Sequence, residues 1–207
     1  MSKLDLGPMD RLLEIGCGVG NLLIPLSFMV KQAYGIDHPE VVESLRKRFS
    51  DPNLILTGSN FFDYQAKINE NYEKILINSA LALLPDEDRA ILFIEKAANL
   101  LSPGGKLLLG DIANIDKKKR FLNTKFGHEF NQKWETQVGS IDGGEEDKQA
   151  ATIFKNVNPS LVPSDKFILK LIRRFRRPGW EAYSLPQPDN LPFGYTREDL
   201  LVVRLLD

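Results

Sequence analysis

The sequence contains little cysteine and little histidine. Cys17 is its single cysteine, and the two histidines are His38 and His128. One cysteine cannot form an intramolecular disulfide, which excludes the cross-linked framework of small secreted domains and favours a reducing cytoplasm. Two histidines leave few side chains that could act as a general base near neutral pH.

Long apolar runs and an excess of one charge are also missing. No stretch reaches the roughly eighteen apolar residues of a membrane helix, and the first residues include Asp5 and Asp10 without an apolar core of a signal peptide. We therefore expect neither a membrane span nor export. The 27 basic and 28 acidic side chains leave a net charge of -1. Such a balance gives no general attraction to nucleic acid or anionic membranes, so any such partner would need a local patch.

The composition fits one domain over residues 1–207, since 43% of the 207 residues are hydrophobic. In its first half, short apolar runs alternate with amphipathic stretches, a pattern typical of a parallel sheet covered by helices on both faces. Strands are predicted over residues 11–16, 32–37, 53–58, 72–79 and 105–112. Helices are predicted over residues 21–30, 39–49 and 86–101. We expect the last of these to end at Leu101, with Gly104 near its C-terminal cap.

The pattern changes between residues 113 and 164. This segment is polar, with only a weak helical period over residues 115–130, and it is interpreted as an insertion after the fifth strand that forms a lid over the substrate. A helix over residues 165–177 follows, capped by Ser164. Two strands end the sequence, over residues 180–185 and 200–206. Their linker is too short for a crossover helix, so we expect them to pair antiparallel.

A glycine-rich turn follows the first strand. Gly16, Gly18 and Gly20 stand where the first strand passes into the first helix, so the backbone can approach a ligand and the helix N-terminus points toward it. A dinucleotide fingerprint would place a glycine or alanine after the next residue, in the spacing G-x-G-x-x-G/A, but Asn21 occupies that position. The second strand then ends at Asp37, whose carboxylate can accept hydrogen bonds from two ribose hydroxyls. These elements predict a nucleoside site rather than a general structural turn.

In this order, the elements resemble the class I family of S-adenosylmethionine-dependent methyltransferases, over most of the chain outside the insertion. The resemblance implies a doubly wound, mostly parallel α/β sheet of seven strands in the order 3-2-1-4-5-7-6, with an antiparallel last strand. It also implies S-adenosylmethionine as the cofactor. The residues expected to surround the cofactor in this part of the chain are Glu14, Gly16, Cys17, Gly18, Gly20, Asp37 and His38.

Further cofactor contacts follow from the same resemblance. Asn60 and Phe61 stand after the third strand, where the family places a polar side chain and an apolar neighbour against the adenine, although aspartate is commoner than asparagine there. Asn78 and Ser79 end the fourth strand, at the position that faces the methionine part and the reacting methyl group.

Catalysis requires little beyond alignment of nucleophile, methyl carbon and sulfur. A hydroxyl or protonated amine also needs a base. His128, in the insertion, and Asp111, at the end of the fifth strand, are the candidates, although an exposed loop histidine and a structural carboxylate are the alternative interpretations. No metal site is expected, because the clustered carboxylates of metal-dependent relatives are replaced by Asn78 after the fourth strand.

The sequence thus predicts a methyltransferase acting on an oxygen or nitrogen of a small polar metabolite, such as a sugar or sugar nucleotide. Basic runs at residues 117–120 and 173–177 could bind a phosphate or carboxylate or could be solvated helix faces. Enzymes that methylate base amines carry Pro-Pro-aromatic after the fourth strand, which Ser79-Ala80-Leu81 does not match, so nucleic acid is disfavoured. RNA methylation by other chemistry and a non-catalytic, cofactor-binding homologue are the two alternatives.

Overall fold

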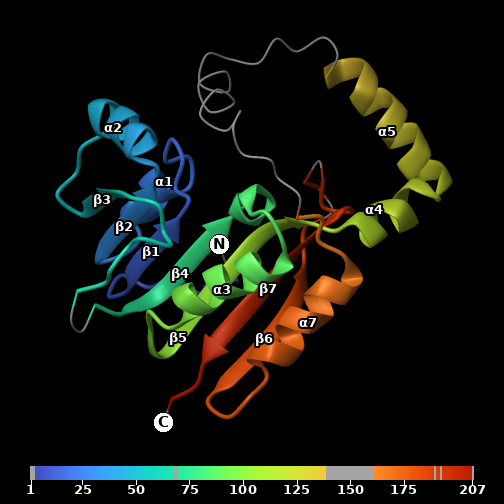
Figure 1. Ribbon diagram of the computed structural model, residues 1–207. Helices are drawn as coiled ribbons and strands as arrows, with labels where there is room; N and C mark the ends of the chain where they lie inside the picture. The colour runs from blue at the N-terminus through green and yellow to red at the C-terminus, as the bar shows by residue number, and fades with distance from the viewer. Residues whose placement is uncertain (1–2, 68–69, 139–160, 189, 192, 207) are drawn as a thin grey trace.

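The computed structural model describes residues 3–67, 70–138, 161–188, 190–191 and 193–206 (Figure 1). Its sheet has seven strands in the order β3-β2-β1-β4-β5-β7-β6. Strand β7 runs antiparallel to its neighbours β5 and β6, whereas all the other neighbouring strands are parallel. The strand order and the direction of the last strand confirm the predicted fold class. The strands are β1 (Arg11–Ile15), β2 (Gln32–Asp37), β3 (Leu54–Gly58), β4 (Tyr72–Asn78), β5 (Leu101–Ala113), β6 (Trp180–Pro186) and β7 (Arg197–Arg204).

Helices cover both faces of the sheet, as the alternating pattern predicts. The two faces are separated because successive side chains of a strand point to opposite sides. In β5, Leu107 and Leu109 join the cluster that contains α3 (Glu87–Ala98) and α7 (Asp165–Phe175), whereas Leu108 joins the cluster that contains α1 (Leu23–Ser27) and α2 (Pro39–Arg48). Helices α3 and α7 lie on the near face in Figure 1.

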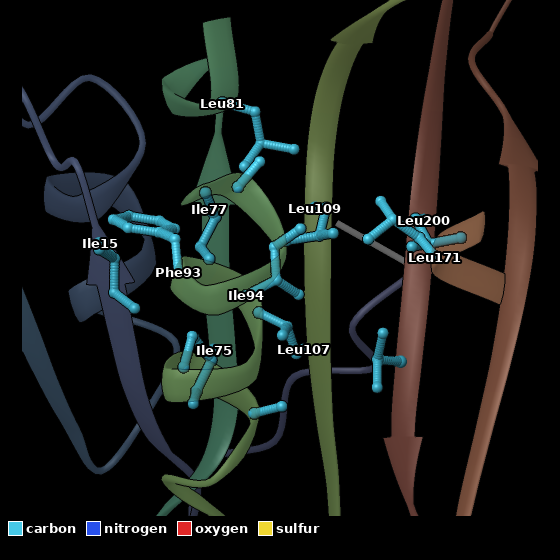
Figure 2. Close-up of a cluster of buried hydrophobic side chains, with 14 of the residues drawn as sticks. Ile15, Ile75, Ile77, Leu81, Phe93, Ile94, Leu107, Leu109, Leu171 and Leu200 are labelled. Atoms are coloured by element: carbon cyan, nitrogen blue, oxygen red, sulfur yellow. The ribbon is translucent and has the colours of Figure 1, made fainter. Parts of the chain in front are cut away.

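Figure 2 shows how α3 covers the middle of the sheet. Phe93 lies on the side toward Ile15 of β1, Ile94 lies between β4 and the leucines of β5, and Leu171 of α7 lies beside Leu200 of β7. Ile94, Ile75 and Ile77 are fully buried. Each such side chain contributes roughly 1.5–3 kcal/mol of hydrophobic stabilisation. This packing fixes the centre of the sheet, from which the site residues extend.

The predicted end of α3 is wrong by three residues. The helix ends at Ala98, and Leu101 already pairs with Tyr72 as the first residue of β5. Leu101 is fully buried there, so its burial in the sheet outweighs another helical turn. Gly104 has φ +77°, but it lies where the register of β5 shifts rather than at a helix cap.

The predicted insertion begins with more structure than its sequence indicates. After β5 come α4 (Ile115–Leu122) and α5 (Lys125–Val138), beyond the edge of the sheet at which β4 ends (Figure 1). Asn114 caps α4, because its Oδ1 accepts hydrogen bonds from the backbone of Asp116 and Lys117 at 3.0 and 3.2 Å. Residues 139–160 of the expected lid lie outside the described residues.

The C-terminal part contains the predicted helix and two strands, although β7 begins at Arg197, three residues before the predicted start, and ends at Arg204. Ser164 caps α7 by accepting the Phe167 N–H at 3.3 Å, and the helix buries one apolar side on the sheet. Strands β6 and β7 pair antiparallel. Within the described ranges, no helix is both long enough and apolar enough to span a membrane.

Candidate functional site

The glycine turn joins β1 to α1 in a left-handed conformation. Gly18 and Gly20 have φ of +53° and +83°, values that side chains other than glycine adopt at a cost. A Cβ on Gly20 would lie 2.9 Å from the Leu45 side chain, which would have to move to make room for it. A Cβ on Gly18 would meet no described atom within 4 Å. Gly18 therefore faces open space into which a ligand can fit, as expected from the sequence.

Asp37 at the end of β2 holds this turn in place. Its Oδ2 accepts the Gly18 N–H at 2.7 Å, and its Oδ1 accepts the His38 N–H at 2.6 Å. The N-cap of α2 is His38, not Asp37, so helix capping does not explain the carboxylate. His38 itself is exposed and makes no side-chain cap. The structure thus brings Asp37 and the glycine turn together.

Glu14 is the least satisfied polar group of the described residues. It is 2% exposed, and its Oε2 is buried without a hydrogen-bond partner within the described part of the chain. Burial, and then the negative charge of Asp37, raise the pKa of Glu14 from 4.5 to about 8. A buried carboxyl without a hydrogen-bond partner would be stabilised by a cation placed beside it.

Cys17 lies within the turn and is 5% exposed. Burial raises the pKa of its thiol, and the nearby charges of Asp37 and Glu14 raise it further. The thiol is therefore protonated and unreactive at neutral pH. Because the side chain is buried, the predicted contact of Cys17 with a ligand would be made by its backbone.

After β3, Asn60 and Phe61 take different roles. Asn60 Oδ1 accepts the Phe62 N–H at 2.9 Å, which shapes the turn. Phe61 is 5% exposed and its ring packs edge-on against Phe93 with centroids 5.0 Å apart. Most of the Phe61 ring thus belongs to the core, and a contact with adenine would involve only its small exposed part.

Two strained residues face each other where β4 and β5 end. Ser79 and Asp111 have φ of +58° and +60°, a conformation that costs on the order of 1–3 kcal/mol per residue and clusters at functional sites. Ser79 Oγ donates to Asp111 Oδ2 at 2.5 Å. Asn78, which precedes Ser79, donates from Nδ2 to Ser79 Oγ at 3.3 Å. Asn78 and Asp111, both expected at the site, are therefore linked through Ser79.

The first residues of β7 complete this polar group. Arg197 Nη1 donates to Asp111 Oδ2 at 3.0 Å, and Asp199 Oδ1 accepts the Asp111 N–H at 2.9 Å. Lys3 holds Asp199 through an ion pair of 2.5 Å. Sequence analysis missed Arg197 and Asp199, because an antiparallel strand brings them next to β5 from more than eighty residues away. The charged residues at the start of the final strand are the sequence feature that could have indicated them.

His128 lies on α5 and forms no hydrogen bond or ion pair with an acid among the described residues. Its side chain is exposed, and its Nε2 is 3.1 Å from Gln132 Nε2. No hydrogen bond joins His128 to Glu129 within the described residues. The structure therefore does not bring His128 to Asp111 as a second catalytic group.

The two basic runs are largely paired with the protein itself. Lys117 donates to the Arg197 carbonyl at 2.7 Å, and Arg120 forms an ion pair with Asp165. In the second run, Arg174 pairs with Glu95 at 2.5 Å. These contacts favour solvated, structural helix faces over a phosphate site. Across the residues described, no three His, Cys, Asp or Glu side chains are placed to hold a metal ion.

Comparison with known proteins agrees with this geometry. Residues 12–105 match a family model described as a methyltransferase domain. The chain is 28% identical over 106 residues to the probable non-canonical nonribosomal peptide synthetase CymA of Salinispora arenicola, covering 49% of this chain and 1% of that protein. It is 25% identical over 120 residues to a probable cobalt-precorrin-6B C(15)-methyltransferase (decarboxylating) of Saccharolobus solfataricus, covering 54% and 57%.

A solved structure covers the whole fold. Phosphoethanolamine N-methyltransferase 1 of Haemonchus contortus, in complex with phosphoethanolamine and S-adenosylhomocysteine, superposes with a TM-score of 0.68 at 16% identity, covering 100% of this chain and 41% of that one. The chain spans less than two thirds of each of these three relatives. Residues 12–105 thus match a methyltransferase domain, and the strand order and the glycine turn give the chain the Rossmann-like fold of the class I S-adenosylmethionine-dependent methyltransferases.

Proposed function

We propose that this chain binds S-adenosylmethionine and transfers its methyl group to an oxygen or nitrogen atom of a small molecule. One observation carries the proposal: the buried, unpaired Glu14 carboxyl lies at the end of β1, beside a glycine turn that is bonded to Asp37. The H. contortus relative supports it, since that structure holds S-adenosylhomocysteine and the small polar molecule phosphoethanolamine.

The residues present fit this cofactor. S-adenosylmethionine carries an ammonium and a sulfonium, and a cation near Glu14 would compensate its buried carboxylate. Its ribose has two hydroxyls, and the Asp37 carboxylate could accept hydrogen bonds from both of them. These bonds would replace or add to those that Asp37 accepts from the backbone N–H groups. The open space at Gly18 allows close approach of a bulky ligand.

When bound, S-adenosylmethionine supplies an electrophilic methyl group, and the chain's residues have to align the acceptor and take its proton. Asp111 is the proposed proton acceptor. The hydrogen bonds that its carboxylate receives from described residues, from Ser79 and Arg197, reach Oδ2. Oδ1 is thus left to accept a proton while Oδ2 is held in position.

Production of S-adenosylhomocysteine by the purified chain tests this function. We expect product to form in the presence of S-adenosylmethionine and one member of an acceptor panel that includes phosphoethanolamine, free sugars and sugar nucleotides, the acceptor class that the sequence favours. Mass spectrometry of the acceptor would show a gain of one methyl group. Cofactor binding without transfer to any acceptor would instead favour the non-catalytic alternative, and transfer to RNA would favour the nucleic-acid alternative.

The Asp37→Ala variant is expected to weaken S-adenosylmethionine binding by more than tenfold. Lost ribose hydrogen bonds are together worth on the order of 1–3 kcal/mol, and the Gly18 N–H also loses its partner. Titration calorimetry measures the change in Kd. Glu40→Ala is the matched control, because Glu40 is an exposed acid in the first turn of α2. Equal affinities of the two variants would remove Asp37 from the site.

A further inference from the structure

A cluster of aromatic rings lies beyond the carboxyl end of β5. It is built from α4, α5 and the segment that leads into β7. The Phe121 and Tyr195 rings are stacked, with centroids 5.0 Å apart and planes 2° from parallel, and Phe126 meets Tyr195 edge-on at 5.9 Å. We call the following six residues the aromatic wall: Phe121, Phe126, Phe130, Trp134, Phe193 and Tyr195.

The aromatic wall adjoins the polar group around Asp111. Arg197 connects the two, because its guanidinium carbon lies 5.0 Å from the centre of the Phe193 ring while Nη1 bonds Asp111 Oδ2 at 3.0 Å. The backbone makes the same connection, since Asn114 N–H donates to the Thr196 carbonyl at 3.1 Å. A molecule resting on the wall would therefore have the proposed proton acceptor at one end.

Internal packing does not use all of the wall. Phe121, at its base, is 9% exposed, whereas Phe126 is 58% and Tyr195 37% exposed. Rings needed only to attach α4 and α5 to the domain would bury their faces as Phe121 does. Two neighbouring, exposed rings from separate segments instead offer an apolar surface on which a planar group can stack.

Arg197 favours a negatively charged group on the bound molecule. Its side-chain hydrogen bonds to the described residues, which reach the carbonyl and Oδ2 of Asp111, both come from Nη1. Nε and Nη2 donate no hydrogen bond to the described residues, so one edge of the guanidinium can receive an oxygen anion. A planar arginine fork suits a carboxylate, which it binds with two parallel hydrogen bonds.

We propose that the aromatic wall and Arg197 together bind an aromatic acceptor that bears a carboxylate. This inference rests on the proposed function and narrows its acceptor to a planar aromatic acid. The ring stacks against Tyr195 and Phe126, and the carboxylate meets the free edge of Arg197. A hydroxyl or amine on such a ring then lies on the Asp111 side, where its proton can be taken.

Calorimetric titration of the chain saturated with S-adenosylhomocysteine tests the class of acceptor. The probes are benzoate, 4-hydroxybenzoate and 2-naphthoate, compared with cyclohexanecarboxylate, which has the charge without the aromatic ring, and with phenol, which has the ring without the carboxylate. We expect at least one aromatic acid to bind ten times more tightly than either comparison compound. Equal affinity of aromatic acids and cyclohexanecarboxylate, or binding of UDP-glucose but of no aromatic acid, would overturn the proposal.

Two variants assign the binding to these residues. Tyr195→Leu is expected to weaken binding of the aromatic acid at least fivefold. Arg197→Gln is expected to make the aromatic acid bind no more tightly than phenol. Tyr183→Leu is the matched control, since Tyr183 on β6 is 43% exposed and outside the wall. Both variants should keep the S-adenosylhomocysteine Kd within twofold. Equal losses in Tyr195→Leu and Tyr183→Leu would show that the wall is not the binding surface.

The titration separates this inference from the proposed function. A chain that binds S-adenosylhomocysteine and methylates a non-aromatic acceptor, yet ignores every aromatic acid, contradicts only the inference. A chain that does not bind S-adenosylhomocysteine contradicts the proposed function itself.

Discussion

The Glu14→Gln variant is expected to be more stable than the natural protein at pH 9, although the two are similar at pH 4.5. The folded state raises the pKa of Glu14 from 4.5 to about 8. Below pH 4.5 the carboxyl is protonated in both states, so it costs nothing. As the pH rises from 4.5 to 8, only the unfolded state releases the proton, and folding stability is lost. A shift of this size corresponds to roughly 5 kcal/mol.

Urea unfolding at several pH values measures this effect. Glutamine keeps the shape of Glu14 without titrating, so the difference in unfolding free energy should grow between pH 5 and pH 8 and level off above pH 8. Glu43→Gln serves as the control, because Glu43 is exposed on α2 and its surface ion pairs contribute little. A constant difference across this range would mean that Glu14 is ionised in the folded protein.

The same substitution should weaken cofactor binding. A cation beside Glu14 favours the ionised carboxylate, so the natural protein is expected to release a proton when it binds S-adenosylmethionine at pH 7. Calorimetry in buffers of different ionisation enthalpy counts that proton. Glu14→Gln has no proton to release at this position.

The Asp111→Asn variant is expected to lower turnover at least a hundredfold with any acceptor that must lose a proton. A hundredfold is the low end of the rate loss expected when a general base is removed. Asparagine tolerates the left-handed backbone found at this position, and its oxygen can still accept from Ser79 and Arg197. The fold and the cofactor Kd should therefore be retained.

Steady-state kinetics on the acceptor identified by the panel measure the loss, with His128→Ala as the comparison. A tenfold or greater loss in His128→Ala, together with normal turnover in Asp111→Asn, would assign the base to His128. In that case α5 would have to bring His128 to the acceptor during catalysis.

Local patterns allowed most of the fold to be predicted. The strands of the first half are short apolar runs, and the glycine turn and Asp37 lie close in sequence to the elements that position them. The end of α3 could not be predicted in this way, because the burial of Leu101 against Tyr72 is a tertiary contact. The segment after β5 was underestimated for a similar reason: α4 and α5 are polar outside, and their apolar side is defined by partners such as Tyr195.

The residues of the candidate site likewise differ in how far sequence alone could predict them. On the cofactor side, the glycine turn and Asp37 come from one continuous stretch of sequence, whereas Asn60, Phe61 and Asn78 were expected only from the family resemblance. On the acceptor side, Asp111 was expected, but Arg197 and Asp199 were not, because they reach Asp111 through strand pairing with β7. The aromatic wall likewise combines α4 and α5 with residues near 195, whose meeting depends on where β7 enters the sheet.

Calorimetric titration of the purified chain with S-adenosylmethionine, with NAD titrated separately, tests the central claim most directly. We predict micromolar binding of S-adenosylmethionine and no detectable binding of NAD, because Asn21 stands where a dinucleotide turn requires a small residue. Binding of NAD, or of neither compound, would contradict the proposed function.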